Sequence, residues 1–176
     1  KRINKEDINT TSYWDENIAA PEFGLRQKKY LELAGKGDSI IELGCGMSPF
    51  LDKARKNFKE VYGLDFSIET LLNAERKYPG VVYLKGDAQK TPFHDKEFDV
   101  CVAGELIEHL EEPEKLIAEM IRITKKRVII STAIMEYNDP EHLWEFSKED
   151  FPMGKVEVVR SEWFPGRKYL FITIDL

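Results

Sequence analysis

The sequence predicts an α/β domain with a seven-stranded, mostly parallel sheet, an antiparallel last strand and helices on both faces. Two observations predict this fold class. Short runs rich in β-branched residues alternate with segments of helical periodicity, and the first run leads through a glycine turn into a helix. The length of 176 residues, of which 42% are hydrophobic, fits one folded domain that buries a core.

Strand and helix patterns follow one another along the chain in the order that this fold requires. Apolar residues at helical spacing predict crossover helices over Ser67–Lys77 and Pro113–Thr124. The connection Trp163–Gly166 is too short for a crossover helix, so the last two strands are expected to pair antiparallel. The predicted strands are Ser39–Leu43, Val61–Asp65, Val81–Lys85, Phe98–Ala103, Arg127–Thr132, Lys155–Arg160 and Lys168–Asp175.

Composition argues against several classes of protein. No apolar run approaches the roughly 20 residues that are needed to cross a bilayer, so no membrane span is expected. Lys and Arg number 26 against 32 Asp and Glu, and the resulting charge of −6 disfavours nucleic acid as a partner. Cys45 and Cys101 occur without a signal-peptide pattern, which favours a reducing compartment and therefore a cytoplasmic location.

A glycine turn follows the first predicted strand. Gly44 and Gly46 allow a ligand to approach the backbone closely, and Ser48 is expected to cap a helix that begins at Pro49. A dinucleotide-binding turn would need a third glycine where Pro49 stands, and proline has no N–H for a pyrophosphate. Tight packing of the strand against the helix is the alternative explanation of this turn.

Three carboxylates are expected at the carboxyl ends of the first three strands. Glu42 lies in the first strand, Asp65 ends the second about 20 residues after the turn, and Asp87 follows the third. Ligands bind in the crevice at this edge of an open parallel sheet, where Asp65 could accept from both hydroxyls of a ribose. Three carboxylates repel a pyrophosphate but suit a ligand that carries positive charge, such as S-adenosylmethionine.

With these residues the sequence resembles the class I S-adenosylmethionine-dependent methyltransferases, in particular those of the methyltransferase 11/12 type. The resemblance extends over nearly the whole chain and implies a Rossmann-like sheet with S-adenosyl-L-methionine as the cofactor. It depends on five segments, which are Glu42–Gly46, Gly63–Ser67, Gly86–Ala88, Phe98–Val100 and Glu108–His109.

The resemblance implies roles at the methionine and ribose end of the cofactor. The backbone of Gly44 and Gly46 and the side chain of Glu42 would hold the methionine part. Asp65 would bind the ribose diol. Glu105, just after the fourth predicted strand, is a further candidate for cofactor binding.

The resemblance also implies an adenine end and a lid. Phe66 would pack near the adenine, and Asp87 would accept from its amino group beside the backbone of Ala88. Tyr13 belongs to a segment that resembles the family's aromatic entry segment, which folds over the cofactor.

The chain is expected to form a single methyltransferase domain over residues 1–176. Within it we expect an N-terminal cap and first helix over 1–38, the cofactor-binding core over 39–132, and a substrate-side insertion with the C-terminal strand pair over 133–176.

A cluster of acids and histidines follows the fourth strand. If this stretch is helical, Glu105, Glu108 and His109 share one face, and such oxygen and imidazole ligands suit Mg²⁺ or Mn²⁺. The pattern resembles two metal-using branches, the ubiquinone-pathway O-methyltransferases and the small-RNA 3′-terminal 2′-O-methyltransferases. In the RNA branch a further histidine completes the metal site, and His142 occupies the matching place. In metal-free members the Glu-His pair shapes the floor of the crevice, so both interpretations stay open.

A hydroxyl acceptor must lose a proton, so His109 and His142 are candidate catalytic bases as well as candidate metal ligands. The leading hypothesis is a methyltransferase that acts on a small-molecule or sugar-containing acceptor. The alternatives are a metal-assisted RNA 2′-O-methyltransferase and a cofactor-binding, non-catalytic partner subunit. A homodimer is the other assembly that the sequence leaves open.

Overall fold

A computed structural model describes residues 21–134, 142–161 and 167–176. Tyr13, the predicted lid residue, lies outside these ranges. The strands of the described residues are β1 (Gly37–Leu43), β2 (Phe58–Asp65), β3 (Val82–Lys85), β4 (Phe98–Gly104), β5 (Thr124–Ile134), β6 (Lys155–Arg160) and β7 (Lys168–Asp175). The helices are α2 (Pro21–Ala34), α3 (Pro49–Ala54), α4 (Ile68–Lys77) and α5 (Pro113–Ile123), with 3₁₀ turns η2 (Ile107–His109) and η3 (Lys148–Asp150).

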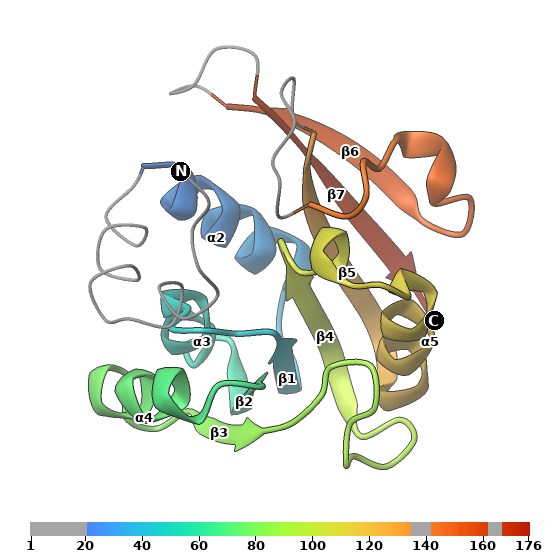
Figure 1. Cartoon of the computed structure of the whole chain (residues 1–176). Helices are drawn as coiled ribbons and strands as arrows, with labels where there is room; N and C mark the ends of the chain where they lie inside the picture. Colours follow the sequence, from blue (N-terminus) through green and yellow to red (C-terminus); the bar gives the residue numbers. More distant parts are fainter. Residues whose placement is uncertain (1–20, 135–141, 162–166) are drawn as a thin grey trace.

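All seven strands form one sheet in the order β3-β2-β1-β4-β5-β7-β6 (Figure 1). The first five strands run parallel, and β7 pairs antiparallel with both β5 and β6. The predicted fold class is therefore confirmed, including the antiparallel pairing of the last two strands. The predicted division of the chain at residues 38 and 132 stays a prediction.

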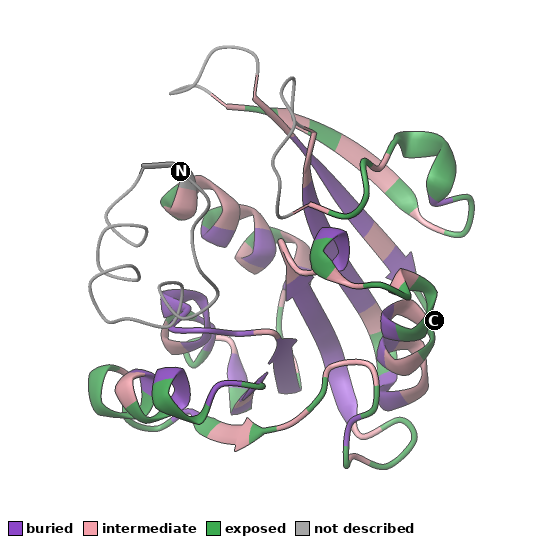
Figure 2. Ribbon diagram, viewed as in Figure 1, coloured by how far each residue is buried: buried purple, intermediate pink, exposed green. Residues whose placement is uncertain are grey.

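Helices cover the sheet on both faces because the inner strands are apolar on both sides. Residues of α2, α3 and α4, among them Tyr30, Phe50 and Leu71, belong to one buried cluster. Residues of α5, among them Leu116 and Met120, belong to the cluster on the other face. Figure 2 shows β1 and β4 buried along most of their length between these two layers.

The helix after the glycine turn begins as the sequence predicts. Ser48 is its N-cap, and the Ser48 hydroxyl accepts a hydrogen bond from the Phe50 N–H at 3.3 Å. Pro49 occupies the first helical position, where the missing N–H costs nothing. Ser67 caps α4 in the same way by accepting from the Thr70 N–H. Both α3 and α4 therefore start after a short turn that follows the carboxyl end of a strand.

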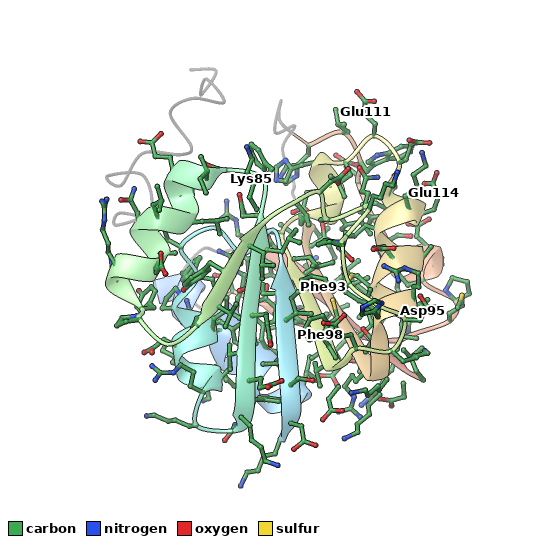
Figure 3. All side chains as sticks on the ribbon, turned by 90° about the horizontal axis from the view of Figure 1, so that it is seen from below. Lys85, Phe93, Asp95, Phe98, Glu111 and Glu114 are labelled. Atoms are coloured by element: carbon green, nitrogen blue, oxygen red, sulfur yellow. The ribbon has the colours of Figure 1, made fainter. Side chains whose placement is uncertain are left out.

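A loop without a helix joins β3 to β4 and crosses one face of the sheet. Phe93 of this loop packs edge-on against Phe98 of β4, and their ring centroids are 4.8 Å apart. Both side chains are labelled in Figure 3. Glu119 of α5 accepts hydrogen bonds from the Thr91 N–H at 2.7 Å and from the Arg122 guanidinium, which also pairs with Asp95 at 2.7 Å. The loop is thus held to α5 by a charged network as well as by aromatic packing.

Replacing Glu119 with glutamine is expected to lower the free energy of unfolding by about 1–2 kcal/mol at pH 7, because the carboxylate side chain is only 10% exposed and is paired. Hydrogen bonds from Arg122 and Thr91 lower the pKa of Glu119 to about 2. Because this pKa is lower in the folded chain than in the unfolded chain, the ionised Glu119 carboxylate stabilises the fold above pH 4.5. The stabilisation is lost as the pH falls towards 2. Urea unfolding of both proteins at several pH values checks this, and a constant difference between pH 7 and pH 2 contradicts it.

Within the described ranges, no helix is both long enough and apolar enough to cross a membrane.

Candidate cofactor-binding site

A cavity of about 560 Å³ opens at the carboxyl ends of β1, β2 and β3, beside the turn that follows β4. This volume lies within the range of small-molecule sites. The lining combines the glycine turn, the ends of two strands and an apolar wall, and consists of Gly44, Leu64, Asp65, Phe66, Lys85, Gly86, Asp87, Ala88, Leu106 and Leu110. Five of the predicted cofactor-binding residues therefore line one cavity.

The glycine turn uses its own amide groups internally. Gly44 and Cys45 both donate their N–H to the Leu64 carbonyl, at 2.8 and 3.1 Å. Gly46 donates its N–H to Asp65 Oδ2 at 2.9 Å. Gly44 has a φ of +67°, and a Cβ there would meet Leu106 Cδ2 at 2.9 Å. The turn can thus offer its carbonyl groups and its small surface to a ligand, whereas the N–H groups of Gly44 and Gly46 are already engaged.

Asp65 is held rigidly at the end of β2. Its Oδ2 accepts from the Gly46 N–H and its Oδ1 accepts from the Ser67 N–H, each at 2.9 Å. The side chain is buried, and this burial raises the pKa of Asp65 despite the stabilising amide groups. Each oxygen can accept a further hydrogen bond, and Asp65 lines the cavity, which suits a diol.

Glu42 lies behind the glycine turn and is buried, with 5% of its surface exposed. Burial, together with the charge of Asp65, raises the pKa of Glu42 to about 8. Its Oε2 atom has no hydrogen-bond partner among the described residues. A buried acceptor of this kind is costly unless a ligand or water supplies a donor.

Phe66, Asp87 and Ala88, the predicted adenine-binding residues, all line the cavity. Phe66 is 70% exposed although it is a large aromatic residue, which is typical of a side chain that a ligand covers. Asp87 is exposed, and its Oδ1 accepts from the Gln89 N–H at 2.8 Å. Ala88 lines the wall next to Asp87. The adenine roles of Phe66, Asp87 and Ala88 stay predictions, but their positions suit them.

The helix that would place Glu105, Glu108 and His109 on one face does not form. Only the single turn η2 forms here, and Glu105 precedes it with a φ of +52°. The Glu105 carboxylate accepts from the Ser131 hydroxyl at 2.8 Å and pairs with Arg26 Nη1 at 3.2 Å. Seven residues are too few to establish helical periodicity, and the left-handed backbone at Glu105 ends any regular turn.

Glu108, His109 and His142 nevertheless come together, with their ligand atoms all within 4.8 Å of one another. The segment after His142 is attached to η2 because the Leu143 N–H donates to the Glu108 carbonyl at 2.8 Å and Trp144 Nε1 donates to the Leu110 carbonyl at 2.7 Å. Glu108 is fully buried, and neither of its carboxylate oxygens has a hydrogen-bond partner in the described part of the chain. Glu105 lies outside this group.

Arg26 of α2 is a functional candidate that the sequence did not reveal. It joins Glu105 at the ends of β4 and β5, where the Glu105 partner Ser131 is also hydrogen-bonded to the Tyr30 hydroxyl at 2.6 Å. The only signal in the sequence was the one-turn spacing of Arg26 and Tyr30 on the first helix, which places them on one face.

Comparison with known proteins identifies the family. The family profile described as "Methyltransferase domain" matches residues 41–132, just over half of the chain. The chain belongs to this methyltransferase family. The match begins in β1 and ends in β5, so it includes the glycine turn, Asp65, Asp87 and Glu105–His109.

Relatives of the methyltransferase chain are similar over its central part. Demethylmenaquinone methyltransferase of Renibacterium salmoninarum is 30% identical over 89 residues, which are 51% of this chain and 38% of that protein. Malonyl-[acyl-carrier protein] O-methyltransferase of Buchnera aphidicola is 30% identical over 110 residues, 62% of this chain and 43% of that protein. The chain spans about two fifths of the length of the first curated relatives it matches.

Solved structures share the fold over most of the methyltransferase chain. An S-adenosylmethionine-dependent methyltransferase from Aquifex aeolicus has a TM-score of 0.69 at 21% identity, covering 90% of this chain and 96% of that one. Geranyl diphosphate C-methyltransferase from Streptomyces coelicolor has a TM-score of 0.70 at 15% identity, covering 94% and 82%. These likenesses support the Rossmann-like fold.

Proposed function

We propose that the protein is an S-adenosylmethionine-dependent methyltransferase that acts on a small-molecule acceptor. The observation that carries the proposal is Asp65, whose two oxygens are fixed by the amide groups of Gly46 and Ser67 at the edge of a cavity of ligand size. Bound S-adenosylmethionine supplies an activated methyl group on a sulfonium. Asp65 would accept from the ribose hydroxyls, and the exposed ring of Phe66 would cover one side of the adenine.

The chain's part in the reaction is to orient the two reactants. Methyl transfer from a sulfonium is an in-line displacement, so the protein must hold the acceptor atom about 3 Å from the methyl carbon, opposite the sulfur. Burial raises the pKa of Glu42 to about 8, so the positive charge of a sulfonium nearby would favour the ionised form of Glu42, which would stabilise that charge in return. Relatives named for demethylmenaquinone, malonyl-[acyl-carrier protein] and geranyl diphosphate support an acceptor other than nucleic acid.

Isothermal titration calorimetry of the chain with S-adenosylmethionine tests the cofactor half of this proposal. We expect saturable binding with a dissociation constant in the micromolar range, and the absence of heat from folded protein overturns the proposal.

Incubation with methyl-labelled cofactor and candidate acceptors tests the second half of the proposal, the small-molecule acceptor. Labelled RNA as the sole product would favour the predicted RNA alternative, whereas activity only with an added partner chain would favour the non-catalytic subunit. Light scattering of the same sample tests the predicted homodimer.

A divalent metal at Glu108, His109 and His142 is a second candidate feature of the same protein. The buried, unpartnered carboxylate of Glu108 fits a metal, because a buried anion needs a positive partner. One carboxylate and two imidazoles suit Mn²⁺ better than Mg²⁺, which prefers oxygen ligands. A bound ion there would lower the pKa of an acceptor hydroxyl, while without it His109 or His142 would serve as the base.

Electron paramagnetic resonance of added Mn²⁺ tests the metal site without any assay of activity. We expect the wild-type protein to remove about one equivalent of the free Mn²⁺ signal and His142→Ala to bind at least about tenfold more weakly. His94→Ala is the matched control, because His94 is exposed in the loop between β3 and β4 and lies outside the cluster. Equal binding by wild type, His142→Ala and His94→Ala contradicts the site.

A further inference from the structure

Two consecutive large apolar residues are exposed in the segment that follows His142. Trp144 keeps 45% of its surface exposed, and its neighbour Leu143 keeps 55%. Single apolar side chains on a protein surface are common and need no explanation, but an apolar patch beside a cavity of ligand size is typical of a binding site. The contacts of Trp144 decide whether this patch belongs to the cavity.

Two hydrogen bonds attach the patch to the wall of the cavity. The Trp144 indole Nε1 donates to the Leu110 carbonyl at 2.7 Å, and the Leu143 N–H donates to the Glu108 carbonyl at 2.8 Å. Leu110 lines the cavity, so the indole is bonded directly to a residue of its wall. The N–H is the only polar group of a tryptophan side chain. Once it is engaged, the exposed part of Trp144 can bind a ligand only through its apolar ring.

A row of aromatic rings connects this indole to the hydrophobic core. The ring planes of Trp144 and Phe146 differ by 28°, with centroids 6.5 Å apart, and Phe146 contacts Phe151 at 5.5 Å. Phe151 is buried in the same cluster as the α5 residues Leu116 and Met120. The indole is therefore held in one orientation before a ligand arrives. A rigid aromatic side chain offers a large contact area and loses little conformational entropy on binding.

The patch also adjoins the residues that are candidates for activating the acceptor. His142 directly precedes it, and the rings of His142 and His109 meet edge-on with centroids 4.9 Å apart. A ligand that rests on Trp144 thus lies close to the candidate bases or metal ligands. This position favours the acceptor as the occupant of the patch.

The chain around these contacts is acidic. Two glutamates, Glu111 and Glu112, come directly after the carbonyl that binds the indole, and Glu145 follows the indole itself. All three are exposed, and Glu111 is labelled in Figure 3. Lys115 pairs with Glu112 and so offsets one of these three charges. A phosphate or carboxylate on the acceptor would be repelled here, whereas an uncharged ring would not.

We propose that Trp144 is a specificity-determining residue that selects acceptors with a planar, uncharged aromatic ring. The acceptor ring stacks on the exposed indole and extends along Leu110 into the cavity. The inference rests on the proposed function, because it narrows the small-molecule acceptor of the same site to the aromatic class. Trp144 lies outside residues 41–132, which match the family profile, so this preference would be a property of this chain.

Equilibrium dialysis of the full chain, saturated with S-adenosylhomocysteine, tests this preference with three probes of one carbon skeleton. These are 2-naphthol, the saturated decahydro-2-naphthol and the charged 2-naphthyl phosphate. Because flat rings stack and saturated rings do not, we expect 2-naphthol to bind about five- to tenfold more tightly than decahydro-2-naphthol. We expect 2-naphthyl phosphate to bind at least about fivefold more weakly than 2-naphthol. Binding of either comparison probe within twofold of 2-naphthol overturns the inference.

Substitutions at residue 144 test whether the preference comes from the indole. Trp144→Leu keeps an apolar side chain without a flat ring, so the preference for 2-naphthol over the saturated alcohol should fall below about twofold. Trp144→Phe should keep an intermediate preference. Val158→Ala is the matched control, because Val158 is 49% exposed on the edge strand β6 and should leave the preference unchanged. An unchanged preference in Trp144→Leu contradicts the role of Trp144.

Nuclear magnetic resonance locates the bound ring. The chain has three tryptophans, and the indole N–H signal that is missing in Trp144→Phe identifies Trp144. This signal should shift when 2-naphthol is added to the wild type, and binding without a shift overturns the inference while the proposed function stands. Failure of the wild type to bind S-adenosylhomocysteine overturns both. Thermal unfolding accompanies each variant, and if Trp144→Leu does not fold, the preference measured in Trp144→Phe decides the question.

Discussion

Asp65→Ala is expected to weaken S-adenosylmethionine binding at least about 100-fold and to abolish methyl transfer. Each hydrogen bond between a carboxylate and a ribose hydroxyl contributes about 1.5–3 kcal/mol, and the variant loses both. It also removes the acceptor for the Gly46 and Ser67 amide groups, so the glycine turn and the start of α4 lose their common support. Binding and protein stability are therefore both expected to fall.

Calorimetric titration and thermal unfolding of the same sample separate these two effects. Asp38→Ala is the matched control, because Asp38 pairs with Lys59 at the opposite edge of the sheet. It is expected to bind the cofactor like the wild type. A folded Asp65→Ala protein that binds within threefold of the wild type would contradict the assignment of Asp65.

Gly104→Ala is expected to lower the free energy of unfolding by about 2–3 kcal/mol and the melting temperature by roughly 5–10 °C. A Cβ at residue 104 would overlap the Tyr30 hydroxyl and lie 2.8 Å from Tyr30 Cζ. The aromatic ring is packed against Phe50 and Phe171 and cannot move aside without losing the hydrogen bond to Ser131. The strain arises next to Glu105, so the affinity for the cofactor should decrease as well.

Gly24→Ala is the control for this substitution. Gly24 lies in α2 with nothing within 4 Å of an added Cβ, so alanine there should leave stability unchanged or raise it slightly. Tyr30→Phe in the Gly104→Ala background removes the overlapping hydroxyl and should recover part of the loss, which a double-mutant cycle measures. A melting temperature of Gly104→Ala equal to that of the wild type contradicts the packing argument.

Strand positions could be predicted because each strand carries its own signal. Ile40, Ile41 and Val100 belong to short β-branched runs whose burial on both faces is visible in the sequence itself. Ser48 and Pro49 are equally local, since capping depends on neighbours along the chain. The carboxyl-edge positions of Glu42, Asp65 and Asp87 followed from the predicted ends of the first three strands, because parallel strands end at the same edge.

What could not be predicted depends on contacts between distant segments. The spacing of Glu105, Glu108 and His109 would place them on one face only if the stretch were helical. The turn that forms is too short for this, and the Glu105 carboxylate pairs with Arg26 on another element. Arg26 is one of many charged residues in the sequence, and only the folded chain shows that it points at an acidic edge. The engaged amide groups of the glycine turn are likewise visible only once Leu64 and Asp65 are in place.

The position of β7 between β5 and β6 has a consequence for how the chain folds. β6 precedes β7 in sequence, yet its register in the sheet depends entirely on β7, since the two pair from Lys155 with Thr173 to Arg160 with Lys168. Until β7 docks along β5, both β5 and β6 present unpaired backbone edges, which are sites of aggregation. Docking of β7 is thus the step that joins β6 to the rest of the sheet. Mutations that delay it are expected to reduce the yield of folded protein rather than its affinity for ligands.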